Sequence, residues 1–269
     1  MIHLLALALY LAAFLLWLRT LVAGGRTGGA SAAWTAVLGV VVHFAAVVRY
    51  AAVFRELPLV GLGPSLSMLA LLTGVGLLAA LALREGGRVG IVLLPLAIVL
   101  QVTALLAGIR PSGEGSAFQG PWFVLHAGLG LGGVVGIALA GAAGWLYLAQ
   151  FRELKAKRMG RLFQFLPPLA TLDRLGRVGS RLGFVLLTLS LALGWAWTVR
   201  FHGTLGQDTA EMWWGLFSWL VVLAALSARA LGDGPPERRS ANANSIAFVL
   251  IAVGYVLLRL SARPGAGFL

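Results

Sequence analysis

Apolar residues recur along the chain in runs of about twenty, and the charged residues fall in the short stretches between them. At 1.5 Å per residue, a helix of that length crosses roughly 30 Å of hydrocarbon. The pattern therefore predicts an all-α, polytopic membrane bundle of about eight transmembrane helices. The predicted spans cover residues 2–21, 32–54, 65–83, 89–109, 121–150, 181–199, 213–230 and 244–260.

The first run opens with MIHLLALALY, which has neither a cationic segment nor a cleavage site of small residues, so it is predicted to be a retained helix. We expect a single integral membrane domain over residues 1–269, with a basic interfacial connection at 151–181 on the cytoplasmic side. In that connection Pro167 and Pro168 interrupt the chain, and Leu169, Leu172 and Leu175 recur at helical spacing. This pattern predicts a separate amphipathic helix against anionic headgroups, or a surface for a cytoplasmic partner.

Composition agrees with a membrane protein, because 59% of residues are hydrophobic and only 11% are charged. The net charge of +12 belongs to inter-helix loops, which indicates a membrane surface and excludes nucleic acid as the expected partner. The positive-inside rule then predicts that both termini lie outside. Fifteen of the 21 basic residues fall in the predicted inward loops, namely Arg19, Arg26, Arg84, Arg88, Arg152, Lys155, Lys157, Arg158, Arg161, Arg174, Arg177, Arg181, Arg229, Arg238 and Arg239.

The chain has no cysteine, which excludes disulfides, thiolate metal sites and thiol redox chemistry. Asp and Glu are absent from the predicted helix interiors, so a transporter coupled to protons through carboxylates is disfavoured. Coupling through a histidine is left open. Metal or cofactor ligands are therefore expected among His, Met and oxygen.

His43 lies midway along the second predicted span, in VVVHFAAVVRY, and must find a partner inside the bundle. Two interpretations remain open: a hydrogen bond to a neighbouring helix, or ligation of a metal or haem iron. Tyr50 shares the face of His43, whereas Arg49 points elsewhere and is expected to bind a headgroup or a propionate-type anion. The candidate hydrogen-bonding partners for His43 are Gln101, Ser67 and Thr73.

His126 lies near the outer end of the fifth span, and a glycine-rich face follows it. That face can admit a neighbouring helix or the edge of a planar macrocycle. Trp122 precedes His126 by one turn, and Trp213 and Trp214 belong to a tryptophan-rich outward loop that also holds His202, Asp208 and Glu211. Aromatic walls beside histidines suit a planar apolar cofactor as well as an interfacial belt.

Several stretches, taken in this order, resemble the cytochrome c assembly family (the CcsA/CcmC superfamily), and within it the HemX/YpjD-like branch. They are VVHFAAV, LVGLGPSLSMLALLTG, VLLPLA, FVLHAGLGLGGVVGIALAGAAGWLYLAQ, LPPLATLDRLGRVGSRLGFVLLTLSLALGWAW and FSWLVVLAALSARA. The resemblance implies a multi-pass protein of the bacterial cytoplasmic (inner) membrane in which His126 matches a haem-flanking histidine. Ser227 stands where haem-transferring members have another histidine, which implies an accessory protein and not an enzyme.

The leading hypothesis is a membrane haem-handling or cytochrome c assembly accessory protein, with no catalytic residues and with haem b in an outward-facing pocket. The expected haem-binding residues are His43, His126, Trp122, Arg49, Trp213 and Trp214, with His43 and His126 as metal ligands. The alternative is a structural or regulatory membrane subunit without a cofactor. Expected partners are the lipid bilayer, haem, and other cytochrome-assembly, haem-synthesis or electron-transfer proteins.

Overall fold

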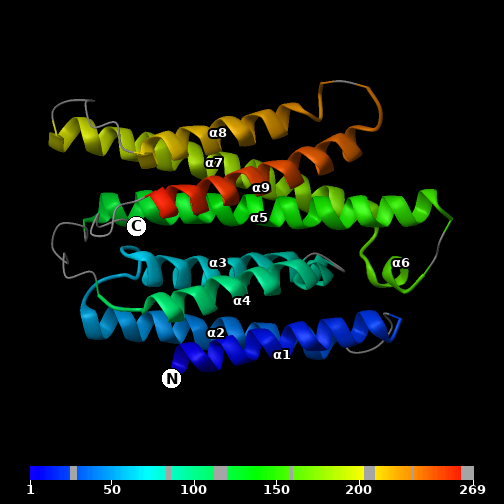
Figure 1. Ribbon diagram of the computed structural model, residues 1–269, viewed down its shortest axis with the longest axis horizontal. Coiled ribbons are helices and arrows are strands. Elements are labelled where there is room, and N and C mark those ends of the chain that lie inside the picture. Colours follow the sequence, from blue (N-terminus) through cyan, green and yellow to red (C-terminus); the bar gives the residue numbers. More distant parts are fainter. Residues whose placement is uncertain are drawn as a thin grey trace.

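The computed structural model describes residues 1–24, 29–82, 86–111, 120–157, 160–202, 210–231 and 233–261. Within these residues the regular elements are helices and no strand occurs, which confirms the predicted all-α fold (Figure 1). The helices are α1 (Ile2–Val22), α2 (Gly29–Phe54), α3 (Leu62–Leu81), η1 (Gly86–Val89), α4 (Gly90–Ala107), α5 (Pro121–Lys155), α6 (Arg161–Phe165), α7 (Leu169–His202), α8 (Ala210–Ser227) and α9 (Pro236–Ser261).

The long helices have the dimensions of membrane spans. Seven of those described are long and apolar enough to cross a membrane, and an eighth, Met212–Ser227 within α8, is apolar but shorter. The beginning of α1 and the end of α9 lie at the same end of the bundle (Figure 1), as an even number of crossings requires. Which end faces the cytoplasm stays a prediction.

The helices form two groups that meet along α3 and α5. Helices α1 to α4 pack on one another; α7 and α9 pack on α5, and α8 packs on α7 and α9 (Figure 1). The short helix α6 packs against the end of α1, where the buried Phe165 ring meets Trp17 edge to face. His43 and His126 consequently belong to different groups, on α2 and α5.

Glycines bring α5 and α7 into close contact. A Cβ on Gly136 would lie 2.8 Å from the carbonyl oxygen of Gly179 and 2.8 Å from the amide nitrogen of Gly183. A Cβ on Gly179 would lie 2.6 Å from the carbonyl oxygen of Gly136. This favours the helix-packing interpretation of the glycine-rich face over the macrocycle interpretation at this level. Nearer the start of α5, by contrast, a Cβ on Gly128 would meet no atom within 4 Å.

The predicted separate interfacial helix in the connection is wrong. Helix α7 begins at Leu169 and continues unbroken through the predicted span, so its first turns are part of a 34-residue helix. Leu172 and Leu175 are buried in the main apolar core instead of facing lipid headgroups. Helix α5 likewise extends five residues past its predicted end, to Lys155. The leucine periodicity was real, but the face that it marks packs on protein.

An ion cluster fixes the start of α7 against the neighbouring segments. Asp173 forms salt bridges with Arg177, one turn later, and with Arg229 at 2.7 Å. Arg229 also reaches Glu237 at 3.4 Å, and its carbonyl oxygen accepts a hydrogen bond from Arg239. These contacts join α7 to the end of α8 and the start of α9.

Candidate functional site

His43 lies in a closed cluster of polar groups at the centre of the first four helices. Its side chain is fully buried, and its Nδ1 atom lies 3.2 Å from the hydroxyl of Tyr10 on α1. Its Nε2 atom lies 3.0 Å from the hydroxyl oxygen of Ser67 on α3. Ser67 is therefore the partner among the three that the sequence suggested. Both ring nitrogens are engaged, which favours the hydrogen-bonding interpretation, and haem ligation by His43 stays a prediction.

His3 extends this cluster toward one end of the bundle. Its Nδ1 atom lies 3.4 Å from the Ser67 hydroxyl and 3.4 Å from the side-chain nitrogen of Gln101 on α4. The His3 and His43 rings meet edge to face, with centroids 5.7 Å apart. Gln101 thus contacts His3 and not His43, and its Oε1 atom is buried without a hydrogen-bond partner in the described part of the chain.

Sequence analysis named neither His3 nor Tyr10 as a member of this cluster. The signal was present, because the buried face of α1 recurs at helical spacing through Ala6, Tyr10, Ala13 and Trp17. His3 precedes Ala6 by three residues and so shares that face. Thr73, the third suggested partner, donates its hydroxyl hydrogen bond to the carbonyl oxygen of Leu69 in its own helix.

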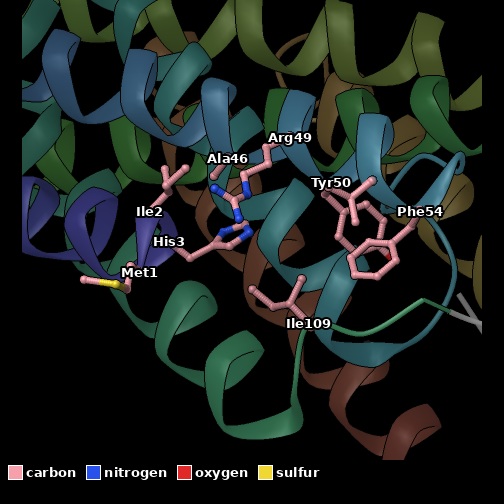
Figure 2. A pocket seen from close by; sticks show the side chains of 9 residues that line it. Met1, Ile2, His3, Ala46, Arg49, Tyr50, Phe54 and Ile109 are labelled. Carbon is pink, nitrogen blue, oxygen red and sulfur yellow. The ribbon is translucent and has the colours of Figure 1, made fainter.

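A pocket of about 340 Å³ adjoins the polar cluster where α1 begins and α2 ends (Figure 2). Arg49 is exposed, whereas Tyr50 is buried on the face of His43, and both residues line this pocket together with His3. Arg49 and Tyr50 are neighbours in the last turns of α2, and the long arginine side chain bends back toward the imidazole of His3.

His126 is held differently from His43. Its Nδ1 atom lies 2.8 Å from the carbonyl oxygen of Ser190 on α7, and a carbonyl oxygen only accepts hydrogen bonds. Nδ1 therefore carries the proton, and Nε2 carries the lone pair in the neutral ring. The hydroxyl of Ser190 in turn donates to the carbonyl oxygen of His126, at 2.9 Å. A fixed tautomer with an available Nε2 is the form in which histidine ligates a metal.

A glycine provides the space for the His126 ring. A Cβ on Gly194 of α7 would lie 2.8 Å from the Cε1 atom and 3.0 Å from the Nδ1 atom of His126. The ring therefore rests directly on the backbone of α7, which restricts its tilt. Sequence analysis identified the glycine-rich face that follows His126 on α5 but not the glycine that lies opposite the ring.

The predicted tryptophans lie on different helices around α7. Trp122 is exposed on the first turn of α5, and Trp213 is exposed on α8. Trp214 packs on α9, where its Nε1 atom donates to the carbonyl oxygen of Ile251 at 3.4 Å and its ring meets Tyr255. Gly215, next to Trp214, faces Leu191, the residue after the Ser190 that holds His126. His126 and Trp214 therefore flank α7 at the same level.

The fold divides the predicted haem-binding residues between the two helix groups, and part of the predicted tryptophan-rich loop lies outside the described residues. His43 and Arg49 are in the first helix group, whereas His126, Trp122, Trp213 and Trp214 are in the second. Among the described residues, no group of three or more His, Cys, Asp or Glu side chains is placed to hold a metal ion. The side chains of His202, Asp208 and Glu211 are outside what the structure describes.

Comparison with known proteins points to one family. The family model described as "Cytochrome C assembly protein" matches residues 2–263, nearly the whole chain. Searches of the curated proteins and of the solved structures found no match. The match includes every element of both helix groups and both histidine sites.

Proposed function

Because the chain belongs to the cytochrome c assembly family, we propose that it handles haem in the membrane during cytochrome c biogenesis, as an accessory protein without catalytic activity. The HemX/YpjD-like branch is the proposed place within the family. The observation that carries the proposal is the arrangement of His126, whose Nδ1–H is committed to Ser190 while Nε2 is left to ligate iron.

The residues around His126 fit a haem better than those around His43. A bound haem would supply an iron atom that accepts the Nε2 lone pair and an apolar face that aromatic side chains can cover. Trp122, one turn before His126, is exposed and available for such a contact, and Trp213 and Trp214 are proposed to cover haem from the α8 side. His43 and Arg49 are assigned other roles, because His43 is saturated with hydrogen bonds and Arg49 lines a separate pocket.

The absorption spectrum of the purified full-length protein, oxidised and reduced, tests this proposal before and after haem is added. We expect a Soret band that His126→Ala loses, together with a lower level of assembled c-type cytochrome in cells carrying that variant. His43→Leu serves as the matched histidine control and should keep the band. A parent protein that shows no band with added haem would contradict the proposal.

The proposed location is the bacterial cytoplasmic membrane, with the end that holds His126 facing outward. Basic residues at the opposite end support this orientation, since Arg152, Lys155 and Arg174 are exposed there. The absence of native cysteine permits a direct test with single-cysteine variants. In intact cells a membrane-impermeant maleimide should label Trp213→Cys and leave Lys155→Cys unlabelled.

The same exposed cations support a second candidate, a regulatory or structural subunit without a cofactor. Its basic end would bind a haem-synthesis enzyme or an electron-transfer complex through acidic surface residues. Charge reversal at Arg152 and Lys155 should then abolish co-purification of the partner, and His126→Ala should leave co-purification intact. The opposite pattern would leave haem handling as the function.

A further inference from the structure

The pocket between the start of α1 and the end of α2 combines the charge of an arginine with apolar side chains. Its lining includes the polar side chains of His3, Arg49 and Tyr50 and the apolar side chains of Val53, Phe54 and Ile109. In Figure 2 the Arg49 side chain lies beside the His3 ring, and the Tyr50 ring lies beside Phe54. Its volume of about 340 Å³ is enough for a headgroup but small for a whole lipid. The occupant must therefore extend beyond the pocket.

Arg49 gives the pocket its charge. No carboxylate among the described residues lies within salt-bridge distance of its guanidinium group. Glu56, the nearest acidic residue in sequence, accepts a hydrogen bond of 2.7 Å from the hydroxyl of Tyr50. That hydroxyl also lies 3.1 Å from the carbonyl oxygen of Arg110, so the Tyr50 donor is already engaged. The guanidinium is the strong donor that remains for a ligand.

His3 adds a second donor position to the same wall. In the contact with Gln101, the amide nitrogen donates and Nδ1 of His3 accepts. The proton of the neutral ring is then on Nε2, and Figure 2 shows this ring beside the Arg49 side chain in the pocket. A guanidinium and an imidazole N–H together form a wall of donors, which an acceptor with negative charge complements.

The position of the pocket along α2 indicates where its ligand comes from. Helix α2 has 26 residues and is about 39 Å long, which exceeds the roughly 30 Å of hydrocarbon. Arg49 precedes its end by five residues, about 7.5 Å, and so lies near the boundary between hydrocarbon and headgroups. Val53 and Phe54 are exposed beyond it, so the pocket opens toward lipid at headgroup depth.

We propose that this pocket binds the anionic phosphate or carboxylate of an apolar molecule of the bilayer, with Arg49 as the charged ligand-binding residue. The apolar chain of that molecule leaves toward the hydrocarbon past Ala46, which lines the pocket about one turn nearer the bilayer centre than Arg49. The headgroup contacts His3, which is hydrogen-bonded to Ser67 and Gln101, so occupancy also steadies the polar cluster around His43. The inference does not depend on haem binding at His126.

Native mass spectrometry of the full-length protein in a zwitterionic detergent tests the proposal. The probes are phosphatidylglycerol, oleate, phosphatidylcholine and inorganic phosphate, added separately. We expect retention of phosphatidylglycerol or oleate in preference to phosphatidylcholine, and no retention of inorganic phosphate. Arg49→Gln should lower the affinity for the retained anion at least about tenfold, because a charge-assisted hydrogen bond is lost.

Arg55→Gln is the matched control, because Arg55 is an exposed arginine six residues later and does not line the pocket. It should retain the anionic lipid as the parent does. Val53→Trp provides a second variant, which fills the pocket while Arg49 stays in place, and it should also lose the lipid. Equal retention by Arg49→Gln and the parent, equal loss in Arg55→Gln, or binding of inorganic phosphate alone would each overturn the proposal.

Discussion

Two histidines that face the interior of this bundle, His43 and His126, differ in how many of their ring nitrogens are hydrogen-bonded. His43 is fully buried, and hydroxyl groups on two other helices occupy both of its ring nitrogens. His126 is only partly buried, and the carbonyl oxygen of Ser190 occupies Nδ1. The same residue type therefore serves as an interhelical link in one group and as an available ligand in the other. The difference lies in how many of its hydrogen bonds the neighbours already satisfy.

The largest expected effect comes from the helix contact that supports His126. Gly136→Val would force a Cβ to within 2.8 Å of backbone atoms on α7, and the two helices would have to separate. We expect a loss of about 3 kcal/mol in the free energy of unfolding, the cost typical of severe overpacking. Unfolding in mixed detergent micelles measures it.

Gly128→Val is the matched control on the same helix, because a Cβ at that position meets no atom within 4 Å. It should unfold with nearly the parent free energy. If both variants were equally destabilised, the loss would come from placing a β-branched residue in the helix and not from the α5–α7 contact.

The next effect separates the two histidines directly. His43→Leu leaves the Tyr10 hydroxyl without its His43 partner in a buried site and leaves the Ser67 hydroxyl only its longer contact with His3, which should cost about 2 kcal/mol of unfolding free energy. His126→Leu should cost less than about 1 kcal/mol because its ring is partly exposed. The Soret band of added haem should change in the reverse order, lost in His126→Leu and kept in His43→Leu. A shared loss of the band in both variants would mean that the two sites are not separate.

How much of this contrast the sequence could predict depends on the scale. The thickness of the hydrocarbon sets the length of a span, so the runs of apolar residues predicted the helices within a few residues. The exceptions are α7, which begins at Leu169 and not at Arg181, and α9, which begins eight residues before its predicted span. In the first turns of α7, a leucine stripe has the same period whether it faces lipid or protein, and the charged residues in that stretch suggested an interface. Asp173 in fact binds Arg229, from a segment far away in sequence.

The sites were less predictable because periodicity identifies the face of a helix but not the helix that covers it. Ser67 was named as a partner for His43, but Tyr10 and His3 were missed since α1 had not been placed against α2. Gly194 could not be recognised as the residue under His126 for the same reason. The separation of Arg49 from His126 follows from the two helix groups, which no local pattern encodes.

A smaller effect is expected at the glycine beneath His126. Gly194→Ala places a Cβ 2.8 Å from Cε1 of the ring, so the imidazole must tilt and lengthen its bond to Ser190. We expect about 1 kcal/mol of lost stability and a haem affinity reduced about tenfold, as misorientation of a ligand by its supporting shell produces. Haem titration measures the affinity. Gly132→Ala is the control, since its Cβ would make only an ordinary contact with Leu186, at 3.4 Å.

The smallest effect is expected at Gln101, although its side chain is as deeply buried as that of His43. Its amide makes one long contact with His3, and its Oε1 atom has no described partner. The hydrogen bonding of this amide therefore adds little stability, and an apolar side chain of similar size should replace it at little cost. Gln101→Leu should change the free energy of unfolding by less than about 1 kcal/mol, in contrast to His43→Leu. A loss of 2 kcal/mol or more would show that the Gln101 amide is fully hydrogen-bonded in the membrane. The cost of replacing a polar residue in this cluster would then follow its burial alone, and the number of hydrogen bonds that the residue makes would not distinguish His43 from Gln101.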